Sequence, residues 1–123
     1  MEENRIGNKN YLNSWKNAFH GIWYVIKTGT NSKVQIAISI IVVALGLFFK
    51  VSIADWLFLT FAIMLVFVSE TINTAIEETV NLVTKEYNPI AKIAKDVAAG
   101  AVVLSAINSV IIAILIIVSK IVK

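Results

Sequence analysis

Three polar residues near the middle of the chain have types and spacing that could do chemistry. Glu70, Asn73 and Glu77 directly follow the apolar run 58–68, where a membrane helix would leave the bilayer. On an α-helix these spacings of three and four residues place all three side chains along one stripe. Ionisable groups at that depth are costly unless they pair or bind something, so the stripe indicates a functional site.

The composition places the chain among integral membrane proteins. Hydrophobic residues make up 58% of its 123 residues, more than the roughly half that is usual in globular proteins. This length allows one small membrane domain over 1–123. The absence of cysteine excludes a disulfide framework and a thiolate metal site. The net charge of +3 is explained by lysines beside the membrane, so it does not indicate nucleic-acid binding.

The first element predicted is an amphipathic helix over about 11–29. Its apolar residues recur at spacings of three and four, and Trp15 and Trp23 lie near Lys16 and Lys27. Tryptophan beside lysine is typical of a helix in the lipid headgroup layer. The alternative is a helix that only packs on the rest of the protein.

Three membrane spans follow, so the predicted fold is all-α with a surface helix and three transmembrane helices. We expect the spans over about 33–50, 53–83 and 90–122. The second turns polar without a helix breaker, so its end should extend into the cytoplasm. Asn88 and Pro89 mark the following turn, because proline disfavours helix at the residue before it.

The positions of the basic residues predict the orientation of the spans. One side carries eight of them and the other carries three: Arg5, Lys9, Lys16, Lys27, Lys33, Lys85, Lys92 and Lys95, against Lys50, Lys120 and Lys123. The amino terminus and the site should therefore be cytoplasmic. Helical rise would then place Glu77 and Asp96 at one level, with Glu70 about two turns deeper.

This arrangement suits a reaction between a water-soluble phosphate donor and a lipid hydroxyl. Phosphoryl transfer needs metal to neutralise phosphate charge, a cation on the transferred group and a base near the attacking hydroxyl. The carboxylates and Lys95 can supply these roles. Taken alone, Lys95 is an ordinary membrane-flanking lysine.

The chain resembles the prokaryotic diacylglycerol kinase family, whose Gram-positive branch includes undecaprenol kinases. The resemblance rests on three motifs and covers nearly the whole chain: Glu70-x-x-Asn73-x-Ala75-Ile76-Glu77, Glu86-Tyr87-Asn88-Pro89 and Ala94-Lys95-Asp96-x-Ala98-Ala99-Gly100-Ala101-Val102. It implies a homotrimer in a bacterial cell membrane that uses ATP and Mg²⁺ to phosphorylate a membrane lipid. Undecaprenol is the preferred acceptor, and diacylglycerol is the alternative.

The resemblance also assigns roles to residues of this chain. Glu70 matches the catalytic base, and Glu77 matches a carboxylate that binds Mg²⁺. The residues that match ATP contacts come from all three motifs: Asn73, Glu77, Glu86, Tyr87, Asn88, Lys95 and Asp96.

Two positions depart from the family pattern. Gly29 stands where relatives usually have a glutamate that is a second metal ligand, and Asn81 stands where they usually have aspartate. Since Mg²⁺ commonly binds through one or two carboxylates plus phosphates, we expect activity with weaker metal affinity. The alternative is a lipid-binding relative without the chemistry.

Two rival classes from outside the family are a channel and a membrane scaffold. A channel would need polar residues through the full depth of one helix, whereas 56–68 and 110–118 are almost wholly apolar. A scaffold would not need three polar residues on one stripe.

Glu78 follows Glu77 in the sequence but points to another side of the helix. We expect Glu78 to be solvated and to pair with Lys85 or Lys92.

Overall fold

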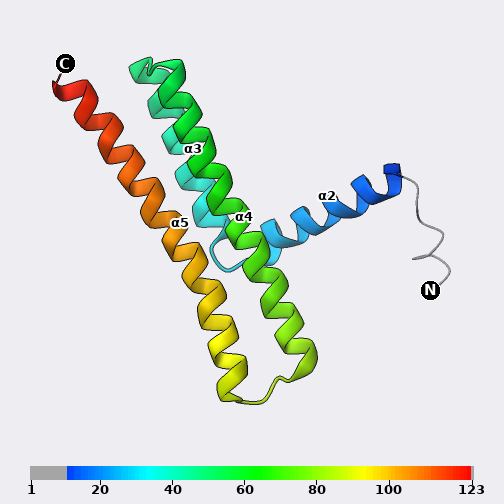
Figure 1. Ribbon diagram of the computed structural model, residues 1–123. Coiled ribbons are helices and arrows are strands. Elements are labelled where there is room, and N and C mark those ends of the chain that lie inside the picture. The colour runs from blue at the N-terminus through cyan, green and yellow to red at the C-terminus, as the bar shows by residue number, and fades with distance from the viewer. Residues whose placement is uncertain (1–10, 123) are drawn as a thin grey trace.

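The computed structural model describes residues 11–122, and all of its regular elements are helices (Figure 1). They are α2 (Tyr11–Thr28), α3 (Ser32–Phe49), α4 (Ile53–Val83) and α5 (Pro89–Val122). The last three are long and apolar enough to cross a membrane. The predicted all-α fold with three candidate spans is confirmed. Three of the basic residues used to predict the orientation, Arg5, Lys9 and Lys123, lie outside the described residues.

Helix α2 leaves the other three at a steep angle, as Figure 1 shows. Most of its residues are exposed, including the aromatic rings of Trp15, Phe19 and Trp23, and Val25 near its end is its buried residue. The Lys27 ammonium lies 5.9 Å from the Trp23 ring centroid. Exposed aromatic rings beside lysines fit a helix in the headgroup layer better than a helix that only packs on the bundle.

The turn between α3 and α4 is built from local hydrogen bonds. Lys50 adopts the left-handed conformation (φ 53°) and its N–H satisfies carbonyls at the end of α3. Ser52 then caps α4: its hydroxyl accepts from the Asp55 N–H (3.1 Å), while the Asp55 carboxylate accepts from the Ser52 N–H (3.3 Å). Such a capping box fixes where a helix starts and how the chain enters it.

Helices α4 and α5 form an antiparallel hairpin with the most extensive packing in the protein (Figure 1). Small buried residues, among them Ala62 and Ala98, let their backbones approach. The Ser109 hydroxyl also donates to the Ala62 carbonyl (3.3 Å). At the turn, the Asn88 side chain accepts from the N–H groups of Ile90 (2.9 Å) and Ala91 (3.1 Å), which caps α5 just before Pro89.

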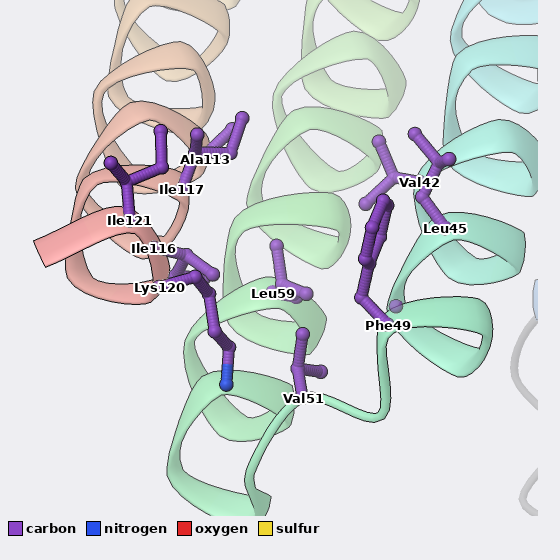
Figure 2. A pocket seen from close by; sticks show the side chains of 11 residues that line it. Val42, Leu45, Phe49, Val51, Leu59, Ala113, Ile116, Ile117, Lys120 and Ile121 are labelled. Carbon is purple, nitrogen blue, oxygen red and sulfur yellow. The ribbon is translucent and has the colours of Figure 1, made fainter. Parts of the chain in front are cut away.

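A groove of about 350 Å³ lies where α3, α4 and α5 meet beside the α3–α4 turn. Figure 2 shows its apolar side chains converging from the three helices, with the Lys120 ammonium at one edge. That ammonium lies 3.4 Å from the Asp55 carboxylate. The groove is therefore lined by hydrocarbon, and the charge at its edge is already paired.

Candidate active site

The Glu70 carboxyl group is the most deeply buried polar group described, with an exposed fraction of 0%. Its Oε2 lies 3.5 Å from the backbone N–H of Asn31, and its Oε1 is buried without a hydrogen-bond partner. A buried carboxylate with an unmade hydrogen bond costs free energy. This position suits a group that acquires a proton, a cation or a hydroxyl donor from a ligand.

The connection between α2 and α3 encloses Glu70. Ser32 is almost fully buried, and its hydroxyl donates to the Val25 carbonyl (2.9 Å), which closes the connection around the end of α2. Gly29 lies inside this turn. A Cβ there would be 2.3 Å from Ser32 Oγ, 2.6 Å from the Val25 carbonyl oxygen and 3.0 Å from Glu70 Oε2.

These distances explain what Gly29 contributes. The turn can close this tightly on the end of α2 only because position 29 has no side chain, since a Cβ would overlap Ser32 Oγ and the Val25 carbonyl oxygen. The position where the family resemblance implies a metal-binding glutamate thus lies beside Glu70, and here it holds no carboxylate. A glutamate cannot be added at that position without rearranging the turn.

Asn73 and Glu77 lie one turn apart on the same stripe of α4. The Asn73 amide donates from Nδ2 to Glu77 Oε1 (3.3 Å), and its Oδ1 is buried without a partner. The stripe therefore carries two unpartnered oxygens, Glu70 Oε1 and Asn73 Oδ1, followed by the partly exposed Glu77 carboxylate. In residues 11–122 no ion pair involves Glu70 or Glu77.

Two charged residues of α5 predicted to contact the nucleotide, Lys95 and Asp96, have different partners in the structure. Lys95 donates from Nζ to the Asn81 side-chain oxygen (2.7 Å), which joins α5 to α4. Asp96 is 62% exposed in its side chain and pairs with Lys92 (2.6 Å) on its own helix. Lys95 therefore reaches α4 one helical turn beyond Glu77, whereas the Asp96 carboxylate is engaged on its own helix.

The remaining predicted nucleotide contacts lie in the connection between α4 and α5. Glu86, Tyr87 and Asn88 are all exposed, and Tyr87 is 80% exposed. The Asn88 side-chain oxygen is already engaged in capping α5. The structure therefore separates two groups: Glu70, Asn73, Glu77 and Lys95 on the packed faces, and the connection residues beyond them.

A hydrogen bond between Tyr24 and Glu78 was not expected from the sequence. The Tyr24 hydroxyl of α2 donates to the Glu78 carboxylate of α4. This hydrogen bond, and the negative charge of Glu78, raise the pKa of Tyr24 above its ordinary value. The expected pairing of Glu78 with Lys85 or Lys92 is wrong, because Tyr24 reaches Glu78 and Lys92 pairs with Asp96.

The donor atoms fit a metal that arrives with a nucleotide. No group of three or more acidic, histidine or cysteine side chains in residues 11–122 could hold a metal ion by itself. Asn73 Oδ1 and the Glu77 carboxylate are oxygen ligands of the kind that Mg²⁺ prefers, and this ion usually takes its other ligands from phosphate and water. The residues present therefore fit a metal ion that takes its remaining ligands from a polyphosphate and water.

The three apolar helices and the polar stripe on α4 are those of a multi-pass membrane protein with a candidate polar site on one of its spans. A sequence profile described as prokaryotic diacylglycerol kinase matches residues 16–117. The chain belongs to this bacterial family of lipid kinases.

Two curated relatives carry kinase names. The chain is 39% identical over 110 residues to a protein named undecaprenol kinase from Bacillus subtilis, and this match covers 89% of each chain. It is 36% identical over 104 residues to a protein named diacylglycerol kinase from Synechocystis sp., which covers 84% of this chain and 59% of that relative.

Proposed function

We propose that this protein is a membrane lipid kinase that transfers the γ-phosphate of ATP to the hydroxyl of a lipid. The observation that carries the proposal is Glu70, a fully buried carboxylate with one unpartnered oxygen on a membrane-spanning helix. Family membership and the names of the relatives support the reaction class.

In this mechanism Glu70 accepts the proton of the lipid hydroxyl. The Asn31 N–H contacts Oε2, which leaves Oε1 as the oxygen without a partner. General bases act on a hydroxyl within hydrogen-bonding distance, and the lipid hydroxyl would take this open place. The α2–α3 connection covers Glu70 in this structure, so it must move for the lipid hydroxyl to reach Oε1.

Asn73, Glu77 and Lys95 would hold the nucleotide. Asn73 Oδ1 and the Glu77 carboxylate would hold Mg²⁺, which neutralises phosphate charge when it is bound. Lys95 supplies a positive charge on the facing helix. Phosphoryl transfer depends largely on such positioning and electrostatic stabilisation.

Undecaprenol is the proposed acceptor. The supporting observation is the 39% identity to the Bacillus undecaprenol kinase over most of both chains. An apolar groove of about 440 Å³ between α4 and α5 begins at Ser69, beside Glu70 in the sequence, and could receive an isoprenoid or acyl tail. Diacylglycerol is the alternative acceptor, because its tails would suit the same groove.

Phosphate transfer from radiolabelled ATP tests the proposal. The purified protein is placed in liposomes that contain either undecaprenol or diacylglycerol, with Mg²⁺ or with a chelator. We expect a labelled product from undecaprenol that requires Mg²⁺. Labelling of diacylglycerol alone would reassign the acceptor, and no product from either lipid would overturn the kinase proposal.

A lipid-binding protein without the chemistry is the second candidate. The observation in its favour is Gly29, since no carboxylate at position 29 accompanies Glu70. This candidate predicts binding of labelled undecaprenol to liposome-embedded protein without any transfer of phosphate.

We also propose a cytoplasmic amino terminus and a homotrimer. The orientation is supported by lysines near the site, including Lys27, Lys33 and Lys85, and the trimer by the family resemblance alone. Labelling of single cysteines placed at positions 11 and 52 in intact cells tests the orientation. Chemical crosslinking in liposomes tests the trimer, which should give a ladder that ends at three subunits.

A further inference from the structure

The Glu77 carboxylate and the Lys95 ammonium are each hydrogen-bonded to the neutral side-chain amide of an asparagine. Glu77 Oε1 accepts from the Asn73 amide (3.3 Å), and Lys95 Nζ donates to the Asn81 amide oxygen (2.7 Å). Asn81 follows Glu77 by one helical turn on α4, so the two amides lie on either side of Glu77 along the helix.

Lys92 provides a contrast one turn before Lys95. It pairs with the Asp96 carboxylate at 2.6 Å, and both side chains are 62% exposed. Its positive charge is therefore balanced by a negative one. The Lys95 ammonium is only partly exposed and is held by an uncharged oxygen, so its charge is not balanced by this partner.

An amide positions an ammonium group without neutralising it. Lysine has three N–H donors, and Asn81 accepts one of them, so two remain for another acceptor. A carboxylate, which relatives usually carry at this position, would also hold the ammonium but would offset part of its attraction for an anion.

We propose that Asn81 is a positioning residue that holds Lys95 against α4 while leaving its charge for the polyphosphate of the nucleotide. The proposal rests on the proposed kinase function for the identity of that anion. Asn81 lies about one helical turn beyond Glu77 on α4 and holds the Lys95 ammonium of α5 there, so a metal-bound polyphosphate on Glu77 could reach that ammonium.

The test compares Asn81→Asp with the unchanged protein in detergent micelles, without any lipid acceptor. Binding of ATP is measured by calorimetry both with Mg²⁺ and with a chelator. We expect Asn81→Asp to weaken ATP binding about tenfold in both conditions, because the new carboxylate pairs with Lys95. The condition without metal matters, since a new carboxylate could also attract Mg²⁺ and hide the loss.

A Lys95→Met background separates positioning from a general effect of the added charge. In that background Asn81→Asp should change ATP affinity much less, because the ammonium that it neutralises is gone. Equal weakening with and without Lys95, or unchanged binding in Asn81→Asp, would overturn the proposal. Asn81→Leu supplies a second variant, which removes the hydrogen bond and should also weaken ATP binding while the thermal unfolding midpoint reports whether the fold is kept.

The outcome can be distinguished from that of the kinase proposal. Protein that binds ATP and shows the Asn81 effect but phosphorylates no lipid would support this inference and overturn the kinase. If the protein phosphorylates lipid and Asn81→Asp has the same KM for ATP, the kinase proposal is supported and this inference is overturned. Protein that neither binds ATP nor transfers phosphate would overturn both.

Discussion

The two ends of the α3–α4–α5 bundle treat their polar groups differently. At the end that carries the α3–α4 turn, Ser52 and Asp55 satisfy each other in a capping box, and Asp55 also pairs with Lys120. At the other end Glu70 and Asn73 are buried with unpartnered oxygens. Buried polar groups are normally paired, so the end that leaves them open is the end prepared for a ligand.

Glycine is used differently at the two ends as well. At the turn end Gly46 is buried against the Trp56 ring, and a Cβ there would lie 2.6 Å from a ring carbon. At the site end Gly29 makes room beside a carboxylate rather than an apolar ring. One end is thus packed for stability, whereas the other keeps polar atoms without hydrogen-bond partners, at a cost in stability.

The largest effect is expected for Glu70→Gln, which replaces the base by a group of the same shape. It should lower kcat for phosphate transfer by at least about 100-fold, because an amide cannot take the proton. The thermal unfolding midpoint should not fall, since a buried carboxylate is removed. The matched change at the turn end, Asp55→Asn, should keep the activity. Comparable loss of activity in both variants would contradict the assignment of the active site to the Glu70 end alone.

The next effect should be the loss of stability in Gly46→Ala. The added Cβ meets the Trp56 ring, and such overpacking costs about 1–3 kcal/mol of unfolding free energy. Denaturation in mixed micelles measures the change, and kcat of the folded protein should stay the same. Gly100→Ala is the control: a Cβ at Gly100 meets nothing within 4 Å, so that variant should be no less stable.

A smaller effect is expected for Glu77→Gln on the metal requirement. Loss of the carboxylate should raise the Mg²⁺ concentration for half-maximal activity about tenfold, because a neutral amide attracts the ion less. Glu78→Gln is the matched control, since the Glu78 carboxylate is bound to Tyr24. If activity depends on Mg²⁺ concentration in the same way in both variants, Glu77 is not a ligand of the metal.

The smallest effect should come from Tyr24→Phe, which removes the hydrogen bond between α2 and α4. Because Glu78 raises the pKa of Tyr24 in the folded protein, the hydrogen bond contributes its full stability below the unfolded pKa of about 10. That contribution is lost as pH rises through the folded pKa. The thermal midpoint of Tyr24→Phe should thus be slightly lower at pH 8 and should converge with that of the unchanged protein at more alkaline pH. Tyr87→Phe, at an 80% exposed position, should show no such convergence.

Much of the fold could be predicted from local patterns. The apolar runs predicted three spans, and the structure places α4 at Ile53–Val83 and α5 at Pro89–Val122. Pro89 explains the start of α5, because proline fits the first helical position. The stripe of Glu70, Asn73 and Glu77 was also predictable, since spacings of three and four residues place side chains on one helical face wherever that helix lies.

The contacts between helices were not predictable in the same way. Sequence spacing suggested that Glu77 and Asp96 lie at one level, but it did not indicate that Lys95 bonds to Asn81 across the two helices. Tyr24 and Glu78 are separated by 54 residues, and nothing in either segment indicated that they meet.

The sequence by itself determined the membrane class, the helices and the polar stripe on α4, because these follow from composition and from the fixed geometry of one helix. Only the tertiary structure decided that the α2–α3 connection closes over Glu70, with the Asn31 N–H on its carboxylate and Gly29 beside it. The physical reason is that the rotation and axial shift of one helix against another depend on all the side chains packed between them.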